Sequence, residues 1–460
     1  MTRPRSSSRG GRRIARVGAV AGAEVVKQAA TRTANLARTD RRAQAALEAR
    51  QGELVERIVI LLGSMRGAAT KVGQMLSMAD AGLVPVERRV QFRERLATLR
   101  DQAPPVSWDA MRGHIARELG ADPREVFSEF ETRPVAAASI GQVYRARMHD
   151  GRDVAVKVQY PGIDEAIDAD MKMLSVALKV LPHVHPGVEA SDIAAEIEHR
   201  CRAELDYVAE AGSTQRLADA YRDHPFIRVP DVVHAVGSPR VLVTEWIDGR
   251  PLLAARDEPD EARARIAEIL FRFYVGGPFT AGITSLDPHP GNALLRDDGS
   301  VAFVDFGSTE QPGRDEADRR LAVMRALFEE APGRLTVALG ERGVVAQRDV
   351  DDQHVFDAFR SVFGWYAADE EVVIPSTLAD DMIAGGADPR TVSADVFRSH
   401  EVPAGLAWLA RAEVAVASTI GQIEPRINLH RVAREWLYGD EPVTELGRRH
   451  QTWRREAERG

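Results

Sequence analysis

Residues 284–309 read TSLDPHPGNALLRDDGSVAFVDFGST, and this stretch decides the fold. Asp287 is followed five positions later by Asn292, and an Asp-Phe-Gly tripeptide begins at Asp305, thirteen positions after Asn292. Asp-Pro and Asp-Phe-Gly are ordinary turn sequences when they occur alone. Here their order and spacing agree with a D-x-x-x-x-N catalytic loop followed by a metal-binding loop.

These residue types suit phosphoryl transfer. The reaction spreads negative charge over the transferred group, so the protein must hold one or two Mg²⁺ ions with hard oxygen ligands. Asn292 and Asp305 supply such ligands, and Asp287 lies where an acceptor hydroxyl or water would lose its proton. Residues 293–295 and 301–304 read as two apolar strands joined by a polar turn, so this hairpin would carry Asn292 and Asp305 to one edge.

Composition limits the class of protein. A chain of 460 residues with 44% hydrophobic content can form two or more cores, as a two-lobed enzyme with an extension requires. The single cysteine, Cys201, excludes an internal disulfide framework and is expected to be a small buried residue on a helix in a reducing compartment. The net charge of −8 argues against a nucleic-acid partner. No apolar run of about 18 residues and no secretory signal is seen, so a cytoplasmic location is expected.

The N-terminal part divides by charge and periodicity. Residues 1–50 are rich in arginine and contain an alanine-rich helical stretch, which fits either a peripheral contact with an anionic membrane or a solvated basic tail. Residues 51–130 show helical apolar spacing, including a helix expected over 108–119. Lys71 and Gln74, in a Lys-x-Gly-Gln motif, lie three positions apart and share a helix face.

Residues 131–246 read as a nucleotide-binding lobe. Val-Ala-Val-Lys ends at Lys157 on the expected third strand, which aims this lysine at nucleotide phosphates. The preceding loop lacks the usual glycine-rich pattern, although Val143 on the strand after it is still expected to line the nucleotide. Alanine cannot adopt positive φ cheaply, so the nucleotide pose or selectivity should differ from that of a protein kinase. The loop residues are Ala136, Ala137, Ala138 and Ser139.

A lysine of this kind needs a glutamate on a helix to orient it. A helix predicted over 192–217 carries two candidates, Glu204 and Glu210, with Glu198 as a weaker rival. Strands predicted over 232–236 and 239–246 lead to a hinge near Glu245, whose backbone would contact adenine. The alternative for Glu245 is a surface charge at the end of a strand.

Taken together, these motifs resemble the UbiB/AarF family of atypical kinases, over residues 58–429. The resemblance rests on Lys-x-Gly-Gln at Lys71, the alanine-rich loop, Val-Ala-Val-Lys, Glu-x-Asp at Glu204, Asp-Pro-His-Pro-Gly-Asn at Asp287 and Asp-Phe-Gly. It implies that the N-terminal helices fold over the site and bring Lys71 and Gln74 near Glu204 and Asp206. Glu210 would then be the better partner for Lys157.

The same resemblance implies binding of ATP or ADP with Mg²⁺, and an ATPase-like or small-molecule activity tied to isoprenoid quinone and lipid metabolism. One position departs from the family: Ser285-Leu286 stands where a histidine and an alanine are common. The histidine corresponds to the first residue of the kinase H-R-D loop, so its loss removes an orienting contact but no metal ligand. Weaker catalysis is expected, not a dead enzyme.

The sequence therefore predicts an α+β, bilobal protein-kinase-like fold with an N-terminal helical extension packed over the active site. The expected divisions are a basic segment (1–50), the helical extension (51–130), the N-lobe (131–246) and a helical C-lobe (247–460). The leading function is that of an ATP-dependent phosphotransferase or ATPase. The alternative is a non-catalytic, nucleotide-gated module that binds a lipid or a partner, which Ser285 and the alanine-rich loop favour.

Overall fold

The computed structural model forms two compact units, which are described separately. The first comprises residues 1–207 with 234–243, and the second comprises 208–233 with 244–460. The predictions for Lys71, Gln74, Ala138, Ser139 and the basic N-terminal segment lie outside the described residues. The structure describes residues 106–137, 140–178, 198–199, 201–341, 351–387, 404–457 and 459.

An antiparallel sheet forms the centre of the first unit. The order is β1-β3-β4-β6, with β2 paired to β3. Alternate residues of β4 are buried, so the three valines of this strand face the core while Lys157 lies on the opposite, half-buried face. The predicted strand–turn–strand pattern is confirmed here. The strands are β1 (Glu129–Phe130), β2 (Ala136–Ala137), β3 (Gly141–Arg147), β4 (Asp153–Gln159) and β6 (Val241–Glu245).

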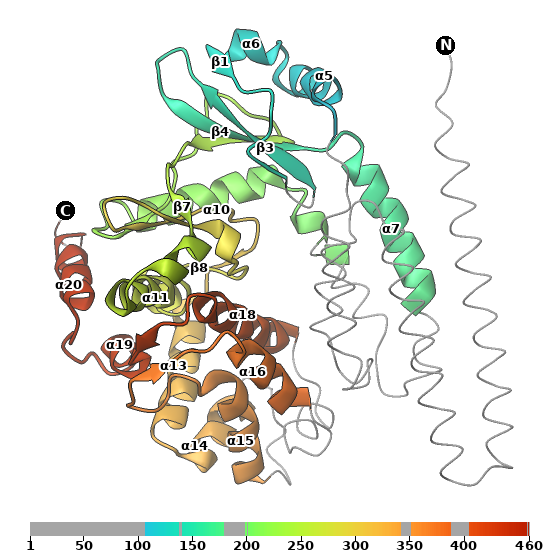
Figure 1. The fold of residues 1–460 in the computed structure, drawn as a ribbon. Coiled ribbons are helices and arrows are strands. Elements are labelled where there is room, and N and C mark those ends of the chain that lie inside the picture. The colour runs from blue at the N-terminus through green and yellow to red at the C-terminus, as the bar shows by residue number, and fades with distance from the viewer. Residues whose placement is uncertain are drawn as a thin grey trace, which may run out of the picture. The chain divides into compact units, whose positions relative to one another are not determined.

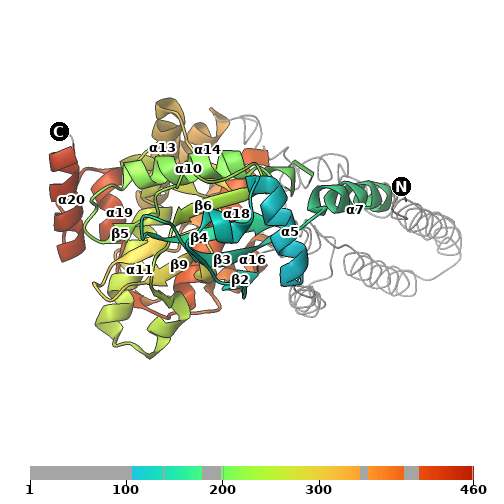
Figure 2. The ribbon, with the colours of Figure 1, turned by 90° about the horizontal axis from the view of Figure 1, so that it is seen from above.

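Three helices accompany this sheet. Helix α5 (Trp108–Leu119) has the predicted bounds and is followed by α6 (Pro123–Val126), while α7 (Ile163–Leu178) follows β4. The Trp108 ring lies 5.3 Å from that of Phe130 and 5.7 Å from that of Tyr144, centroid to centroid, which packs α5 on the sheet (Figure 2). These aromatic contacts bury apolar area that a small sheet could not cover by itself.

Two predicted elements are wrong. Residues 232–236 do not form a strand; only Val232 makes an isolated bridge, to Thr244. The helix predicted over 192–217 is interrupted, because residues 204–206 form a turn closed by backbone hydrogen bonds to Arg202 and Ala203. Glu204 and Asp206 lie in this turn, and Asp206 directly precedes α10 (Tyr207–Ala220). Aspartate is favoured just before a helix, because its side chain can bond backbone groups that a continuous helix would otherwise use.

The second unit combines α10 and a small four-stranded sheet with a mainly helical body (Figure 1). The sheet order is β5-β10-β9-β7. Its strands are β5 (Ile227–Arg228), β7 (Arg250–Pro251), β9 (Ala293–Leu295) and β10 (Val301–Phe303); the helices after α10 are α11 (Asp260–Tyr274), α12 (Gly277–Thr280), α13 (Arg314–Phe328), α14 (Pro332–Gly340), α15 (Asp352–Phe363), α16 (Leu378–Ala387), α18 (Ala404–Gly421), α19 (Leu429–Leu437) and α20 (Glu445–Ala457).

Helix α11 is the centre of this unit. Every residue from Ala267 to Tyr274 is buried, although the sequence of this half-helix contains a glutamate and an arginine. The Phe273 ring stacks on Phe303 of β10 at 3.7 Å between centroids, which fixes the hairpin against the helix. Within the described residues, no helix is long and apolar enough to cross a membrane.

Candidate active site

The β9–β10 hairpin brings together two residues that the motifs singled out. Ala293 pairs with Phe303, and the Val304 N–H donates to the Asn292 carbonyl at 2.9 Å. Asn292 and Asp305 therefore lie at the same end of the hairpin, as the sequence predicts. The apolar strand residues are buried or half-buried and the turn between them is polar and short, so the turn sets this register.

A second pair of short strands brings Asp287 to the same group of residues. β8 (Thr284–Ser285) pairs with β11 (Thr309–Glu310), and the Leu286 N–H donates to the Ser308 carbonyl at 2.9 Å. The Asn292 side-chain amide donates to the Asp287 carbonyl at 3.4 Å. The two ladders thus hold the catalytic-loop and Asp-Phe-Gly segments side by side.

Asp305 has a strained backbone, with φ of +67°. Aspartate tolerates this left-handed region better than most residues, but glycine would adopt it at lower cost. Strain of this kind persists only where the surrounding structure enforces it, and it is common at functional sites. The neighbouring Phe306 is 2% exposed and anchors the loop in the core.

Glu210 lies beside this loop, in the first turn of α10. It is 5% exposed, and a methyl group placed on Gly307 would lie 3.6 Å from Oε2 of Glu210 and 3.9 Å from Oδ1 of Asp305. The Thr309 hydroxyl donates to the Ser213 hydroxyl at 2.9 Å, which ties β11 to α10 one turn beyond Glu210. Of the two leading candidates from the sequence, Glu204 and Glu210, Glu210 is therefore the one on a helix and against the Asp-Phe-Gly loop.

Tyr274 is a residue of this site that the sequence reasoning missed. It ends α11 and is 6% exposed, and its carbonyl accepts a hydrogen bond from the Thr284 hydroxyl at 2.9 Å. Burial raises the pKa of its phenol, and the negative charges of Asp287 and Asp305 raise that pKa further. No motif marks a tyrosine thirteen positions before Asp287, so only its helical packing places it here.

The nucleotide-binding candidates on β2, β3 and β4 belong to the first unit. Val143 pairs with Lys157 across β3 and β4, so both side chains lie on the same face of the sheet, and Nζ of Lys157 lies 5.2 Å from the Tyr207 ring centroid. Ala136 and Ala137 form β2 and are exposed. A Cβ on Gly141 would lie 2.3 Å from the Val158 carbonyl oxygen, so strand packing explains this glycine.

Glu245 ends β6 and takes part in an ion pair. Its carboxylate accepts hydrogen bonds from the Arg228 guanidinium at 2.6 and 2.8 Å, and its N–H donates to the Asp231 carbonyl at 2.9 Å. The side chain thus has the structural role that the alternative interpretation describes. An adenine contact at this hinge would have to use other backbone atoms, and it stays a prediction.

The donor set near the hairpin suits Mg²⁺. Asn292 and Asp305 offer hard oxygen atoms, and the amide of Asn292 is oriented by its bond to Asp287, which directs the Asn292 oxygen away from that carbonyl. No group of three or more His, Cys, Asp or Glu in the described part of the chain could hold a metal ion. Mg²⁺ usually keeps one or two protein ligands and takes the others from phosphate and water.

A D-x-x-x-x-N segment and an Asp-Phe-Gly tripeptide, held side by side by two pairs of short strands, form the arrangement of a kinase-like protein. The family model described as the ABC1 atypical kinase-like domain matches residues 98–334, about half of the chain. The chain therefore belongs to the ABC1 atypical kinase-like family, and the resemblance to UbiB/AarF kinases is confirmed.

Individual relatives agree with this assignment. "Atypical kinase COQ8B, mitochondrial" of Rattus norvegicus is 34% identical over 64% of this chain and 54% of the relative. "Atypical kinase coq-8, mitochondrial" of Caenorhabditis elegans is 32% identical over 60% of this chain and 36% of the relative. A solved structure, the complex of Rv3197 with erythromycin from Mycobacterium tuberculosis, has a TM-score of 0.60 and 29% identity, covering 86% of this chain and 98% of that one. The matches thus span about half or less of the length of these two curated relatives.

Proposed function

We propose that this chain binds Mg-ATP or Mg-ADP and transfers or hydrolyses the terminal phosphoryl group, in support of isoprenoid quinone or lipid metabolism. The observation that carries the proposal is the double ladder, β9–β10 and β8–β11, which gathers Asp287, Asn292 and Asp305. These three residues have the order, spacing and chemistry that phosphoryl transfer needs.

Each residue has a distinct proposed role. Asp287 orients the acceptor hydroxyl or water and takes its proton, while Asn292 and Asp305 hold Mg²⁺. Bound Mg²⁺ would neutralise charge on the phosphate oxygens. Lys157 positions the phosphates, and Glu210 orients Lys157. Val143 and the alanine-rich loop would cover the nucleotide, with Glu245 near the adenine.

The acceptor is proposed to be a small molecule or water, not a protein. Lys71 and Gln74 are expected to lie on a helix that covers the peptide groove, with Glu204 and Asp206 as their partners. The arginine-rich segment before residue 51 supports a peripheral contact with an anionic membrane, where each nearby cation contributes about 1 kcal/mol. This location would bring the site to lipid substrates.

A second candidate is a nucleotide-gated module without turnover. Ser285 favours it, because this residue occupies the histidine position of an H-R-D loop and its hydroxyl lies 3.5 Å from the Asp287 N–H, at the limit of a hydrogen bond. A serine there supports Asp287 less firmly than an imidazole would.

ATP hydrolysis by the full chain, with Mg²⁺ and with or without anionic liposomes, separates the two candidates. We expect Asp287→Asn to lower turnover by about 10²–10⁴-fold, since it removes the proton acceptor, and Asp305→Asn to abolish Mg²⁺-dependent turnover. Asp297→Asn, in the exposed turn of the same hairpin, is the matched control and should retain full activity.

Nucleotide affinity is measured on the same proteins with a fluorescent ATP analogue. Turnover that membranes stimulate, and that both variants lose, supports the enzyme. Tight binding with equal background turnover in wild type and both variants would reject the catalytic proposal in favour of the module.

A further inference from the structure

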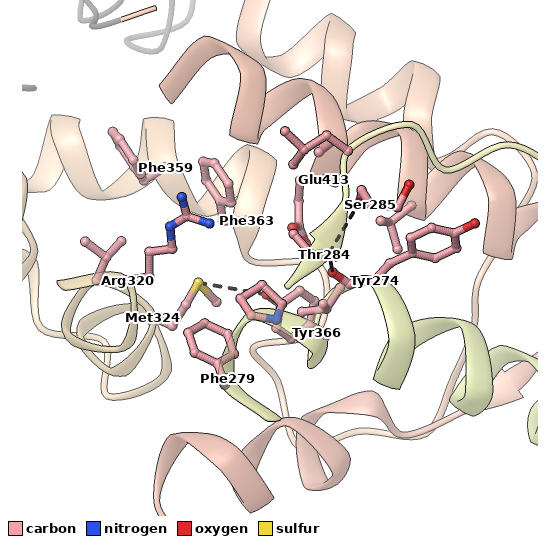
Figure 3. Close-up of a pocket in the computed structure, with 16 residues that line it drawn as sticks. Tyr274, Phe279, Thr284, Ser285, Arg320, Met324, Phe359, Phe363, Tyr366 and Glu413 are labelled. Carbon is pink, nitrogen blue, oxygen red and sulfur yellow. Dashed lines mark hydrogen bonds between the residues drawn. The ribbon is translucent and has the colours of Figure 1, made fainter. Parts of the chain in front are cut away.

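An apolar pocket of about 100 Å³ lies in the second unit, next to the segment that leads into Asp287 (Figure 3). Its size is comparable to that of engineered cavities of about 150 Å³ that bind benzene. Thr284, Ser285 and Leu286 form one wall, so the small side chain of Ser285 leaves room there that a larger residue would fill. The proposed phosphoryl transfer uses none of this space.

The other walls are mainly aromatic. Phe279, Phe359, Phe363 and Tyr366 line the pocket, as does Tyr274 at the end of α11 (Figure 3). The faces of aromatic rings carry negative electrostatic potential and attract organic cations, most strongly where water is excluded. An aromatic enclosure of this kind therefore favours an ammonium ligand over an anion.

A carboxylate completes the enclosure. Glu413 of α18 lines the pocket and is half-buried, and one of its oxygens accepts a hydrogen bond from the Trp365 indole at 2.8 Å. Burial raises the pKa of Glu413 to about 7, and hydrogen bonds from Trp365 and Tyr366 oppose that rise. A buried carboxylate becomes stable in its ionised form when a cation pairs with it.

Among the described residues, Arg320 is the cation that lines the pocket, and it does not balance this charge. Arg320 is 8% exposed and is paired with Glu310 at 2.6 Å and Glu316 at 3.1 Å. Oε2 of Glu310 has no hydrogen-bond partner among the described residues. Two carboxylates thus share the Arg320 guanidinium, Glu413 lies on the same pocket, and the charges of Asp287 and Asp305 also act on Tyr274 at the pocket wall. The local charge is negative and favours a positive ligand.

We propose that this pocket binds a small apolar molecule that carries one protonated amine, with the amine paired to Glu413 and the apolar body between the aromatic rings. This inference goes beyond the proposed phosphoryl transfer and does not depend on it.

The test uses the full chain and three probes of similar shape in isothermal titration calorimetry at pH 8: benzylamine, benzyl alcohol and toluene. We expect benzylamine to bind at least about tenfold more tightly than the two neutral probes, since only it pairs with the carboxylate. Glu413→Gln keeps the size of the side chain and should remove that preference. Glu371→Gln, an exposed glutamate outside the pocket, should retain it.

The dependence of affinity on pH gives a second readout. Between pH 6 and pH 8 the affinity for benzylamine should rise about tenfold as Glu413 ionises, while benzyl alcohol and the Glu413→Gln protein should show no change. The tyrosines that line the pocket hold constant charge in this range, because burial raises the pKa of Tyr366 and of Tyr274, and Arg320 is paired with Glu310 and Glu316.

Ala412→Phe, which fills the pocket, should abolish binding of all three probes. If benzylamine does not saturate, if toluene binds as tightly, or if Glu413→Gln binds benzylamine like the wild type, the proposal is wrong. None of these outcomes involves ATP hydrolysis, so failure here is distinct from failure of the proposed function.

Discussion

Two regions of the second unit bring carboxylates close together, and they are assembled in different ways. In the loop and hairpin of residues 284–310, neighbours along the chain pair in short strands and bring Asp287 and Asp305 together. Around α11 and α18, the partners are distant: Arg272 contacts Glu435, 163 positions later, and Glu413 accepts from Trp365, 48 positions earlier.

The two regions also differ in the groups that lie around their carboxylates. Around α11, the guanidinium of Arg272 is 2% exposed and bonds Glu268 and Glu435 at 2.7–2.8 Å, which satisfies their charges inside the protein. In the loop region, Asp305 has a strained backbone and forms, with Asn292, the donor set that suits Mg²⁺. The fixed internal cation therefore marks the carboxylates around α11 as structural.

The largest effect should come from removing the internal cation. Arg272→Ala leaves Glu268 and Glu435 buried without a counter-charge, and we expect the free energy of unfolding to fall by about 3–5 kcal/mol. Urea denaturation followed by tryptophan fluorescence measures this change in the free energy of unfolding. Arg334→Ala, which removes an exposed ion pair with Glu329, should cost less than about 1 kcal/mol. Equal costs for the two variants would show that burial does not make the Arg272 ion pairs matter more to stability than an exposed pair.

A smaller effect with a defined pH dependence is expected at Glu413. Its folded-state pKa, raised by burial to about 7, exceeds the unfolded value of 4.5, so the folded protein holds this proton more tightly. Stability from this group is fully present below pH 4.5 and is lost as pH rises through 7.

Glu413→Gln removes this loss of stability at high pH. Because the residue is only half-buried, we expect the variant to be more stable than the wild type by about 1–2 kcal/mol at pH 8, with a smaller difference at pH 5. Urea denaturation at the two pH values measures both. A difference that does not change with pH would show that Glu413 does not titrate in this range.

The smallest effect concerns the strained aspartate. Asp305→Gly and Asp305→Ala both remove the carboxylate, but only glycine adopts φ of +67° without cost. We expect the glycine variant to be more stable than the alanine variant by about 1 kcal/mol, and neither to support Mg²⁺-dependent turnover. Thermal unfolding compares them. Equal stability would show that the loop relaxes and that its strain is not enforced by the fold.

Much of the candidate site could be predicted from the sequence because its parts interact locally. Asn292 and Asp305 are separated by one hairpin, and the short polar turn between two apolar runs sets its register. Val-Ala-Val-Lys similarly placed Lys157 on a strand whose other face is buried. The prediction of one continuous helix is wrong at Glu204, because the apolar periodicity continues across a turn that backbone hydrogen bonds close.

The sequence by itself determined the family, the order of the motifs and the hairpin that carries two of the site residues, because spacing and alternation express contacts between near neighbours. Only the tertiary structure decided that Glu210 lies against Gly307, that Tyr274 lies next to the carboxylates and that Glu413 lines an aromatic pocket. The physical reason is that the effect of a charge depends on burial and on partners far away in the chain, and these are fixed only when helices such as α11, α15 and α18 pack together.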